Sequence, residues 1–222
     1  MFLKKELTEY NRYQAFAVHM VISLVIFFIL LFFITQYWYP GILFDTGNGW
    51  KAIAMIVGID LILGPLLTFI VFNPKKSSLK FDLSIIALVQ TAALIYGTWT
   101  IHQTRPAALV FMSNKFVTFY YTSIIGKDIY ELSSKNDFML YHEIPKDDPS
   151  FELSPEQFRP YKEQILKALP TLKTYALINE ETQSMILPLD PHLSKNRYIE
   201  ISSNQGAFLS ITDIIKPETA SN

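Results

Sequence analysis

The sequence predicts an α+β membrane protein, in which a three-helix transmembrane bundle is followed by a mixed α+β extracytoplasmic domain. Three long apolar runs fill the first 105 of the 222 residues. Only a helix satisfies its own backbone hydrogen bonds across about 30 Å of hydrocarbon, so each run is expected to be a membrane-spanning helix. Of the 39 charged side chains (19 Lys and Arg plus 20 Asp and Glu), only 11 precede Asp82. We therefore expect a transmembrane domain over 1–104 and a folded domain over 105–222.

The three predicted spans are residues 15–39, 51–72 and 82–103. The first is about 25 residues long, whereas the apolar region of a cleaved signal peptide has about 7–15. It ends in Gln36-Tyr37-Trp38-Tyr39-Pro40, which has the aromatic character of a membrane interface and lacks a small-x-small cleavage pattern. We expect this span to be retained. Pro106 stops the third span from continuing as a helix.

The distribution of Lys and Arg predicts how the spans are oriented. The N-terminal tail carries Lys4, Lys5 and Arg12, and the 73–80 loop carries three lysines with no acid, whereas the 40–50 loop has Asp45 and no base. Positively charged short loops remain on the cytoplasmic side. The tail and the 73–80 loop are therefore expected in the cytoplasm. Three crossings then place residues 105–222 on the opposite side, which in a Gram-negative bacterium is the periplasm.

Asp60 is the residue in the spans that packing explains least. It lies near the middle of the second span, twelve residues from Phe72, which corresponds to a depth of about 18 Å at 1.5 Å per residue. A charge at that depth costs at least a few kcal/mol unless it is paired or neutralised. Tyr96 of the third span is expected at the same level, with Gln90 and His19 nearer the cytoplasm.

Two interpretations of Asp60 compete. In the first, its carboxyl group is protonated, or hydrogen-bonded to Tyr96, and keeps the three helices in register. In the second, it faces a groove and meets a polar or cationic group on another membrane helix. A proton or ion pathway is a weaker third possibility, because a relay needs several such residues in line. The candidate contact set for an intramembrane partner is Asp60, Tyr96, Gln90, Gly64 and Pro65. Gly64-Pro65 is expected to kink the second helix without breaking it.

The part after residue 105 combines strand and helix patterns. The expected strands are 107–112, 116–121, 138–144, 175–178, 198–202 and 207–211, with turns at 113–115 and 204–206. Ser154-Pro155-Glu156-Gln157 has the form of a capping box, and a regular helix is expected from 160 to 169. Phe158, Tyr161, Ile165 and Leu169 are its expected buried face. Residues 219–222 are expected to form a frayed tail.

The motif search is negative for catalysis. The chain contains no Gly-rich phosphate loop, no His-Glu-x-x-His and no Gly-x-Ser-x-Gly. It has no cysteine, which excludes disulfides and thiol chemistry, and its net charge of −1 gives no support to nucleic-acid binding. His142 and Glu143 are adjacent on a predicted strand and therefore point to opposite faces, so a solvent-exposed polar pair is expected. His19 has no second ligand at helical spacing. We expect no enzyme activity, no cofactor and no metal site.

Several motifs carry a resemblance to a known family. They are Trp38-Tyr39-Pro40-Gly41, the run from Gly58 to Thr68, the run from Lys80 to Gln90, Tyr96-Gly97, Arg105-Pro106 and Leu109-Val110-Phe111. Over residues 12 to 112 the chain resembles the type IV pilin accessory proteins, the TfpX/TfpZ family. The resemblance implies an inner-membrane protein that binds a cognate major pilin, in a chaperone-like manner, and assists its stability, its assembly or pilus dynamics. It implies no catalysis and no cofactor.

Two alternatives from other classes stand beside it. One is a membrane-anchored sensor or transport accessory protein, in which Asp60 titrates and the periplasmic domain binds a small ligand. The other is a membrane-tethered enzyme of an unfamiliar type. The lipid bilayer is an expected partner in every case.

Overall fold

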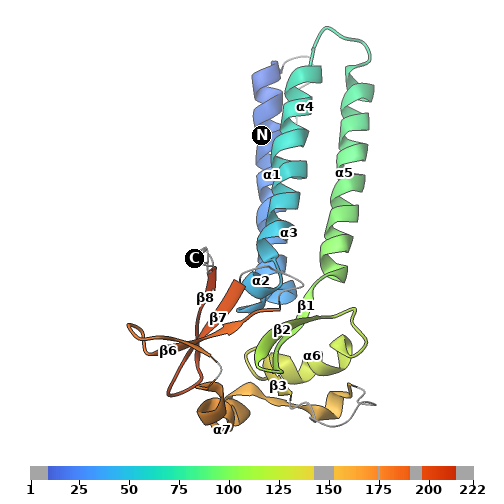
Figure 1. Cartoon of the computed structure of the whole chain (residues 1–222). Coiled ribbons are helices and arrows are strands. Elements are labelled where there is room, and N and C mark those ends of the chain that lie inside the picture. Colours follow the sequence, from blue (N-terminus) through green and yellow to red (C-terminus); the bar gives the residue numbers. More distant parts are fainter. Residues whose placement is uncertain (1–9, 143–152, 175, 191–196, 214–222) are drawn as a thin grey trace, which may run out of the picture. The chain divides into compact units, whose positions relative to one another are not determined.

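The computed structural model describes residues 10–142, 153–174, 176–190 and 197–213. It divides into two compact units. Residues 1–39 and 48–104 form the first, which we call the membrane unit, and residues 40–47 and 105–222 form the second unit. Long apolar helices make up the membrane unit, and two sheets with short helices make up the second (Figure 1). The fold class predicted from the sequence is confirmed.

The membrane unit contains the three predicted spans. The first is α1 (Arg12–Phe33), continued by the π-helix η3 (Ile34–Trp38). The second consists of α3 (Gly49–Ile56), the π-helix η4 (Val57–Leu63) and α4 (Gly64–Val71), and the third is α5 (Leu79–Gln103). Among the described residues, these three helical stretches are long and apolar enough to cross a membrane. The chain is therefore a membrane protein.

The first span begins three residues earlier than the hydrophobic run suggested. Asn11 precedes α1 and its side chain accepts a hydrogen bond from the Gln14 backbone N–H (2.9 Å), while the Gln14 side chain accepts one from the Asn11 N–H (3.1 Å). This reciprocal capping box satisfies two N–H groups that the first turn leaves without partners. A polar cap thus sets the start of the helix, ahead of its first apolar residues.

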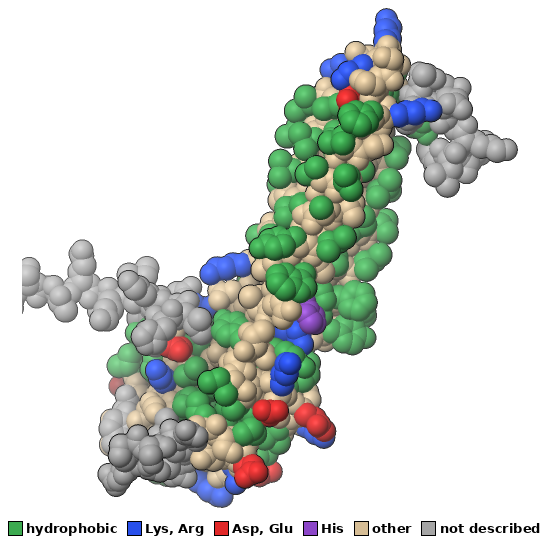
Figure 2. Space-filling model, turned by 90° about the vertical axis from the view of Figure 1, so that its right-hand side faces the viewer, with side chains coloured by type: hydrophobic (Ala, Val, Ile, Leu, Met, Phe, Trp, Pro, Cys, Tyr) green, Lys and Arg blue, Asp and Glu red, His purple; other side chains and the backbone are tan. Residues whose placement is uncertain are grey.

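The second span supplies the contact surface for the other two. Helix α1 packs along α4, and α5 packs against α3, η4 and α4 (Figure 1). Most apolar side chains of the three helices point outward, as expected of a surface that faces lipid. Figure 2 shows hydrophobic side chains over the visible face of this unit and Lys and Arg at the end that carries the α4–α5 connection.

The second unit is built on two four-stranded sheets. The first has the order β2 (Lys115–Tyr120), β1 (Pro106–Met112), β3 (Met139–His142) and β4 (Phe158–Pro160). Its β1–β2 hairpin is antiparallel, whereas β1 and β3 are parallel and connected through α6 (Gly126–Ser134). The second sheet is an antiparallel meander of β5 (Leu177–Asn179), β6 (Ser184–Pro188), β7 (Arg197–Ser202) and β8 (Phe208–Asp213).

Most predicted elements of this unit are confirmed. The 113–115 turn is present, with Ser113 and Asn114 in the left-handed region, and a turn lies at 203–205. Helix α6 and strand β6 were not predicted. The 143–144 end of one predicted strand, position 175 of another and the 219–222 tail lie outside the described residues.

Helix α7 (Tyr161–Leu172) follows a single 3-10 turn, η5 (Pro155–Gln157), and the short strand β4. Its buried face contains Tyr161, Ile165 and Leu169, as predicted, and they pack in a core with residues of both sheets. The Tyr161 hydroxyl donates a hydrogen bond to the Gly206 carbonyl (3.0 Å), and burial raises the pKa of this hydroxyl. Phe158 is also buried, but it lies on β4 and packs in a separate cluster with β1, β3 and α6.

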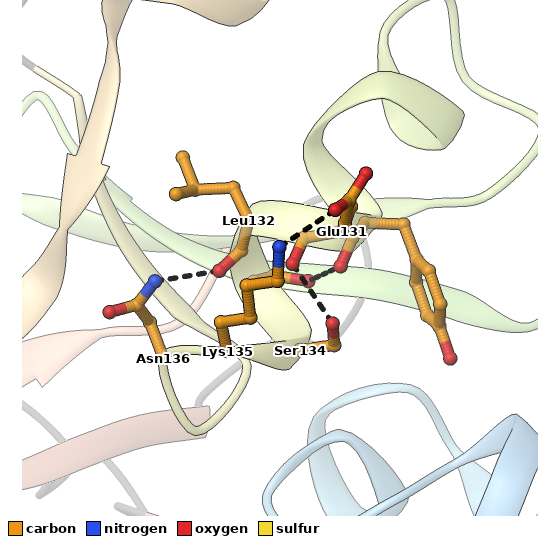
Figure 3. Close-up of polar contacts among 7 residues, drawn as sticks. Glu131, Leu132, Ser134, Lys135 and Asn136 are labelled. Atoms are coloured by element: carbon orange, nitrogen blue, oxygen red, sulfur yellow. Dashed lines mark hydrogen bonds and ion pairs between the residues drawn. The ribbon is translucent and has the colours of Figure 1, made fainter.

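The C-terminal end of α6 is closed by local hydrogen bonds (Figure 3). Lys135 Nζ lies 2.7 Å from Glu131 Oε1, and the hydrogen bond and charge of Lys135 lower the pKa of Glu131. Asn136 Nδ2 donates to the Leu132 carbonyl (2.7 Å), and Ser134 Oγ donates to the Glu131 carbonyl (2.9 Å). These bonds satisfy carbonyl groups that have no partner inside the helix.

The connection between the first two spans is part of the second unit. It contains the short helix α2 (Leu43–Thr46), and Leu43 is fully buried in the core shared by the two sheets. The Thr46 carbonyl accepts a hydrogen bond from Thr118 Oγ1 (3.4 Å), and the Asp45 carbonyl accepts one from Arg197 Nη1 (3.1 Å). A Cβ added at Gly47 would lie 2.6 Å from Pro106. Residues 40–47 therefore fold together with the chain after residue 105.

Candidate functional site

Asp60 lies in the π-helix η4, at a position where the helix cannot satisfy its own backbone. In a π-helix the carbonyl of residue i accepts from the N–H of residue i+5, and for Asp60 that residue is Pro65, which has no N–H. The side chain of Gln90 reaches this carbonyl from α5, with Nε2 3.4 Å from the Asp60 oxygen. The Gly64-Pro65 pair thus changes the helix type without breaking the span, since α4 continues from Gly64.

The Asp60 side chain joins all three spans. It is 2 % exposed, and its Oδ1 accepts hydrogen bonds from Ser23 Oγ of α1 (3.2 Å) and Gln90 Nε2 of α5 (2.7 Å). Its other oxygen, Oδ2, is buried and has no hydrogen-bond partner among the residues that the structure describes. A buried polar atom without a partner is destabilising, so a hydrogen-bond donor that reached Oδ2 would stabilise this arrangement.

Gly64 makes the Gln90 contact possible. A Cβ added at Gly64 would lie 2.2 Å from Gln90 Nε2, so a larger residue there would displace the amide. Pro65 is buried directly beside it. Asp60, Gln90 and Gly64 of the predicted contact set are therefore brought together in one place.

Tyr96 is not part of this arrangement, and the predicted hydrogen bond between it and Asp60 is wrong. Its side chain is 68 % exposed and packs against Trp99, with ring centroids 6.2 Å apart. The reason is helical geometry: six residues separate Gln90 from Tyr96, which turns the side chain by about 240° at 100° per residue. Depth along a helix does not determine the face, and only the Gln90 contact shows which face of α5 points toward Asp60.

A second polar contact lies beside the first. His19 Nδ1 of α1 and Thr68 Oγ1 of α4 are 2.6 Å apart, so His19 is hydrogen-bonded inside the unit. Ser23 and Thr68 were missed in the sequence analysis. The signal was present in the spacing, because His19 and Ser23 are four residues apart on one helix, and Asp60 and Thr68 are eight residues apart on another.

These residues line a cavity of about 510 Å³ bounded by α1, the second span and α5. Its polar members are His19, Ser23, Asp60, Thr68 and Gln90, together with Tyr10 and Thr91, and the remaining lining residues are apolar. The cavity therefore contains a hydrogen-bond acceptor, Asp60 Oδ2, among mostly apolar side chains. Within the described ranges, no group of three or more His, Cys, Asp or Glu side chains is arranged to hold a metal ion.

His142 does not form the exposed polar pair that the sequence predicted. His142 is buried, its ring lies 4.8 Å from that of Phe158, and Nε2 lies 3.3 Å from Gln157 Oε1. The strand places it on the core side of the first sheet. Glu143 lies outside the described residues.

Comparison with known proteins identifies relatives in one bacterium. The chain is 33% identical over 140 residues to the fimbrial assembly protein of serogroup I of Dichelobacter nodosus and 34% identical over 140 residues to that of serogroup E1. Each match covers 62% of this chain and 49% of the relative, so the chain spans about half the length of these two proteins. No family model matches the chain, and no solved structure matches it.

A third relative is covered more completely. The fimbrial assembly protein of serogroups C1 and C2 of Dichelobacter nodosus is 38% identical over 96 residues, which are 42% of this chain and 73% of that relative. Nearly three quarters of a protein of this kind is thus matched at an identity well above 30%. The chain belongs to the family of the fimbrial assembly proteins.

Proposed function

We propose that this protein is a TfpX/TfpZ-like accessory factor of the bacterial inner membrane that binds a cognate type IV major pilin and assists its stability, its assembly or pilus dynamics. The proposed role is chaperone-like and does not involve catalysis. Membership of the family of fimbrial assembly proteins supports a role in pilus assembly. The observation that supports a pilin helix as the partner is the Asp60 carboxyl group. It is buried inside the membrane unit, and one of its oxygens is unbonded among the described residues.

The mechanism follows from how a pilin waits for assembly. Its single apolar helix stays in the inner membrane while its globular head is in the periplasm. The membrane unit packs along that helix, and Asp60 offsets a polar or cationic group on it. The second unit contacts the head and provides specificity. Because the subunit later leaves for the fibre, the contact is weak and reversible.

The proposed orientation has the N-terminus and the α4–α5 connection in the cytoplasm and the second unit in the periplasm. Support comes from Lys75, Lys76 and Lys80 in that connection, since short cytoplasmic loops are rich in Lys and Arg. Residues 40–47 belong to the second unit, so both extracytoplasmic segments of this orientation are on one side. A pilin with a periplasmic head needs its partner domain on that side.

The test is recovery of pilin with purified variants at matched membrane abundance. Asp60→Leu removes the acceptor and is expected to insert at least as well as the parent, because the penalty for an acid at that depth disappears. It should lose most of the pilin. Asp60→Asn retains an acceptor oxygen and should keep much of it. Unchanged recovery with Asp60→Leu would show that the acid is structural.

A clean deletion tests the function itself. Surface pili or pilin abundance should fall, while unrelated envelope proteins stay at their normal level. Normal piliation and pilus dynamics in the deletion strain, with no homologue present, would contradict the proposed function.

A further inference from the structure

A second cavity continues the one that contains Asp60. It measures about 560 Å³ and lies between α1 and α5 toward the ends that carry Trp38 and His102. Ile26 and Leu94 line both cavities, so the two are adjacent. We call the two cavities together the groove. It lies between α1 and α5, and residues of the second span, such as Asp60 and Thr68, line its first half and not its second.

The two halves of this groove differ in chemistry. The half toward the α4–α5 connection holds the polar group of Asp60, Gln90, Ser23, His19 and Thr68. The other half is lined by Ile26, Ile29, Leu30, Leu94, Ile95, Trp38 and Trp99, with Thr98 and His102 as its polar members. An occupant is therefore expected to be mostly apolar, with a polar group at the level of Asp60.

We propose that this groove receives one transmembrane helix of a partner protein, with a single hydrogen-bond-donating side chain that binds Asp60 Oδ2. The inference rests on the proposed function for the identity of the partner. The lining residues of the groove support the rest of it. It specifies what the proposed function left open: the face of the membrane unit that is used and the depth at which the partner must be polar.

The buried Asp60 carboxyl group favours a helix over a lipid as the occupant of the groove. An acyl chain fills apolar space but has no donor, so it would leave Oδ2 buried and unsatisfied. A helix satisfies its own backbone at this depth and can project one donor toward the carboxyl group. In apolar surroundings a hydrogen bond between an ionised donor and a carboxylate is stronger than one between neutral groups. The unbonded acceptor therefore selects a helix with one hydrogen-bond-donating side chain, such as Lys, Arg or a hydroxyl residue.

The position of Asp60 determines the register. It lies twelve residues from the end of the second span at Phe72, which is about 18 Å along the helix axis. A partner helix must carry its donor close to the midplane of the bilayer, with apolar residues on both sides. Displacing the donor by two helical turns would move it about 11 Å, beyond the reach of the carboxyl group.

Site-specific photo-cross-linking tests the proposal in the full-length chain reconstituted in lipid nanodiscs. A photoreactive amino acid is introduced at Ile26 or Leu94, which line the groove, and at Ile62 or Ile70 as matched controls. The control positions are lipid-exposed on the second span and line neither cavity. The probe is a synthetic Leu-Ala helix of about 20 residues with one central Lys. Two further probes have no Lys, or have it two turns away.

We expect the central-Lys helix to cross-link at Ile26 and Leu94 about tenfold more than at Ile62 and Ile70, the factor that about 1.4 kcal/mol gives. The two other probes, and the Asp60→Leu protein, should lose most of this difference. Asp60→Asn serves as the second variant, and it should retain part of the cross-linking at equal membrane abundance.

Equal cross-linking at all four positions, cross-linking to lipid alone, or a yield independent of the Lys would overturn the proposal. The outcome also separates it from the proposed function. If pilin cross-links through Ile62 or Ile70, the proposed function is supported and the groove is excluded as the binding site. If the central-Lys helix enters the groove but the protein recovers no pilin, the groove is supported as a helix-binding site and pilin is excluded as its partner.

Discussion

Asp60 in the membrane unit and Glu200 in the second unit hold their carboxyl groups in contrasting environments. Glu200 lies on β7, where Oε1 accepts hydrogen bonds from Ser184 Oγ and Thr182 Oγ1 and Oε2 accepts one from Ser210 Oγ (2.7 Å). The bonds from Ser184, Ser210 and Thr182, in that order, lower the pKa of Glu200. Asp60 is more deeply buried, yet among the described residues only one of its oxygens is bonded.

The difference separates a carboxyl group whose two oxygens are both bonded from one with an unbonded oxygen among the described residues. Neighbouring strands satisfy Glu200 on both oxygens, so it contributes to the sheet and needs nothing further. Asp60 receives two donors on the same oxygen, and within the described part of the chain the other oxygen has none, in a place where water is scarce. Hydrogen-bond partners, and not exposure alone, therefore distinguish the two acids, and this difference is the basis for the proposed role of Asp60.

The two units also bury their apolar residues in opposite ways. In the membrane unit most large apolar side chains face outward, whereas in the second unit Leu109, Phe116 and Ile199 are fully buried. The first pattern suits a lipid environment and the second suits water. Each of the following predictions tests one consequence of this contrast.

The largest expected effect is all-or-none labelling across the membrane. The chain has no native cysteine, so Ser77→Cys in the α4–α5 connection and Asn204→Cys in the second unit can each be labelled alone. Both positions are exposed. In intact spheroplasts an impermeant thiol reagent should label the Asn204→Cys protein and leave the Ser77→Cys protein unlabelled until the membrane is permeabilised. The reverse pattern would contradict the proposed orientation.

Truncation of the buried residue between the first two spans should destabilise the second unit. Leu43 is fully buried in the core, so Leu43→Ala should lower the free energy of unfolding by about 2–5 kcal/mol. Thermal denaturation of the detergent-purified protein measures it. The control is Leu166→Ala on α7, where the side chain is 53 % exposed and the change should stay within about 0.5 kcal/mol. Equal effects would mean that residues 40–47 do not stabilise this unit.

A methyl group at Gly64 should disturb the site of Asp60. Gly64→Ala would push the Gln90 amide away from Asp60, and we expect the membrane unit to lose about 1–2 kcal/mol. Gly58→Ala is the matched control, because its Cβ would meet nothing within 4 Å and alanine favours a helix. Melting temperatures in detergent compare the two. A Gly64 variant as stable as the Gly58 variant would argue against the close Gln90 contact.

The smallest effect concerns Glu200 and pH. Its pKa is lowered in the folded state from the ordinary value of 4.5, so its bonds stabilise the fold above that value, and this stability is lost as the pH falls through the folded pKa. The parent should therefore lose more stability than Glu200→Gln between about pH 6 and acid pH. We expect less than about 1 kcal/mol, because the carboxylate is partly exposed. The measurement is the free energy of unfolding as a function of pH for both proteins, and parallel profiles would contradict the predicted contribution of Glu200.

Hydropathy and strand patterns were sufficient for the architecture. Apolar length predicted the three spans, and two β-rich runs around a turn predicted the β1–β2 hairpin. The capping-box pattern and the helical spacing of apolar residues predicted helix α7. They did not predict α6, whose Gly126–Ser134 segment is short and only partly apolar, nor β6, which ends in a proline. Local propensity is weak in such segments, and packing against the neighbouring strands decides their structure.

The sequence by itself determined that the chain spans a membrane, that Asp60 lies deep in the second span, and that Gly64 is one turn away from it on the same helix. These follow from spacing along single helices, where depth is proportional to residue number. Only the tertiary structure decided that Ser23 and Gln90 bind one oxygen of Asp60, that Tyr96 faces away, and that Leu43 is in the core of the second unit. The physical reason is that such contacts depend on how helices rotate and pack against one another, and no pattern within one helix contains that information.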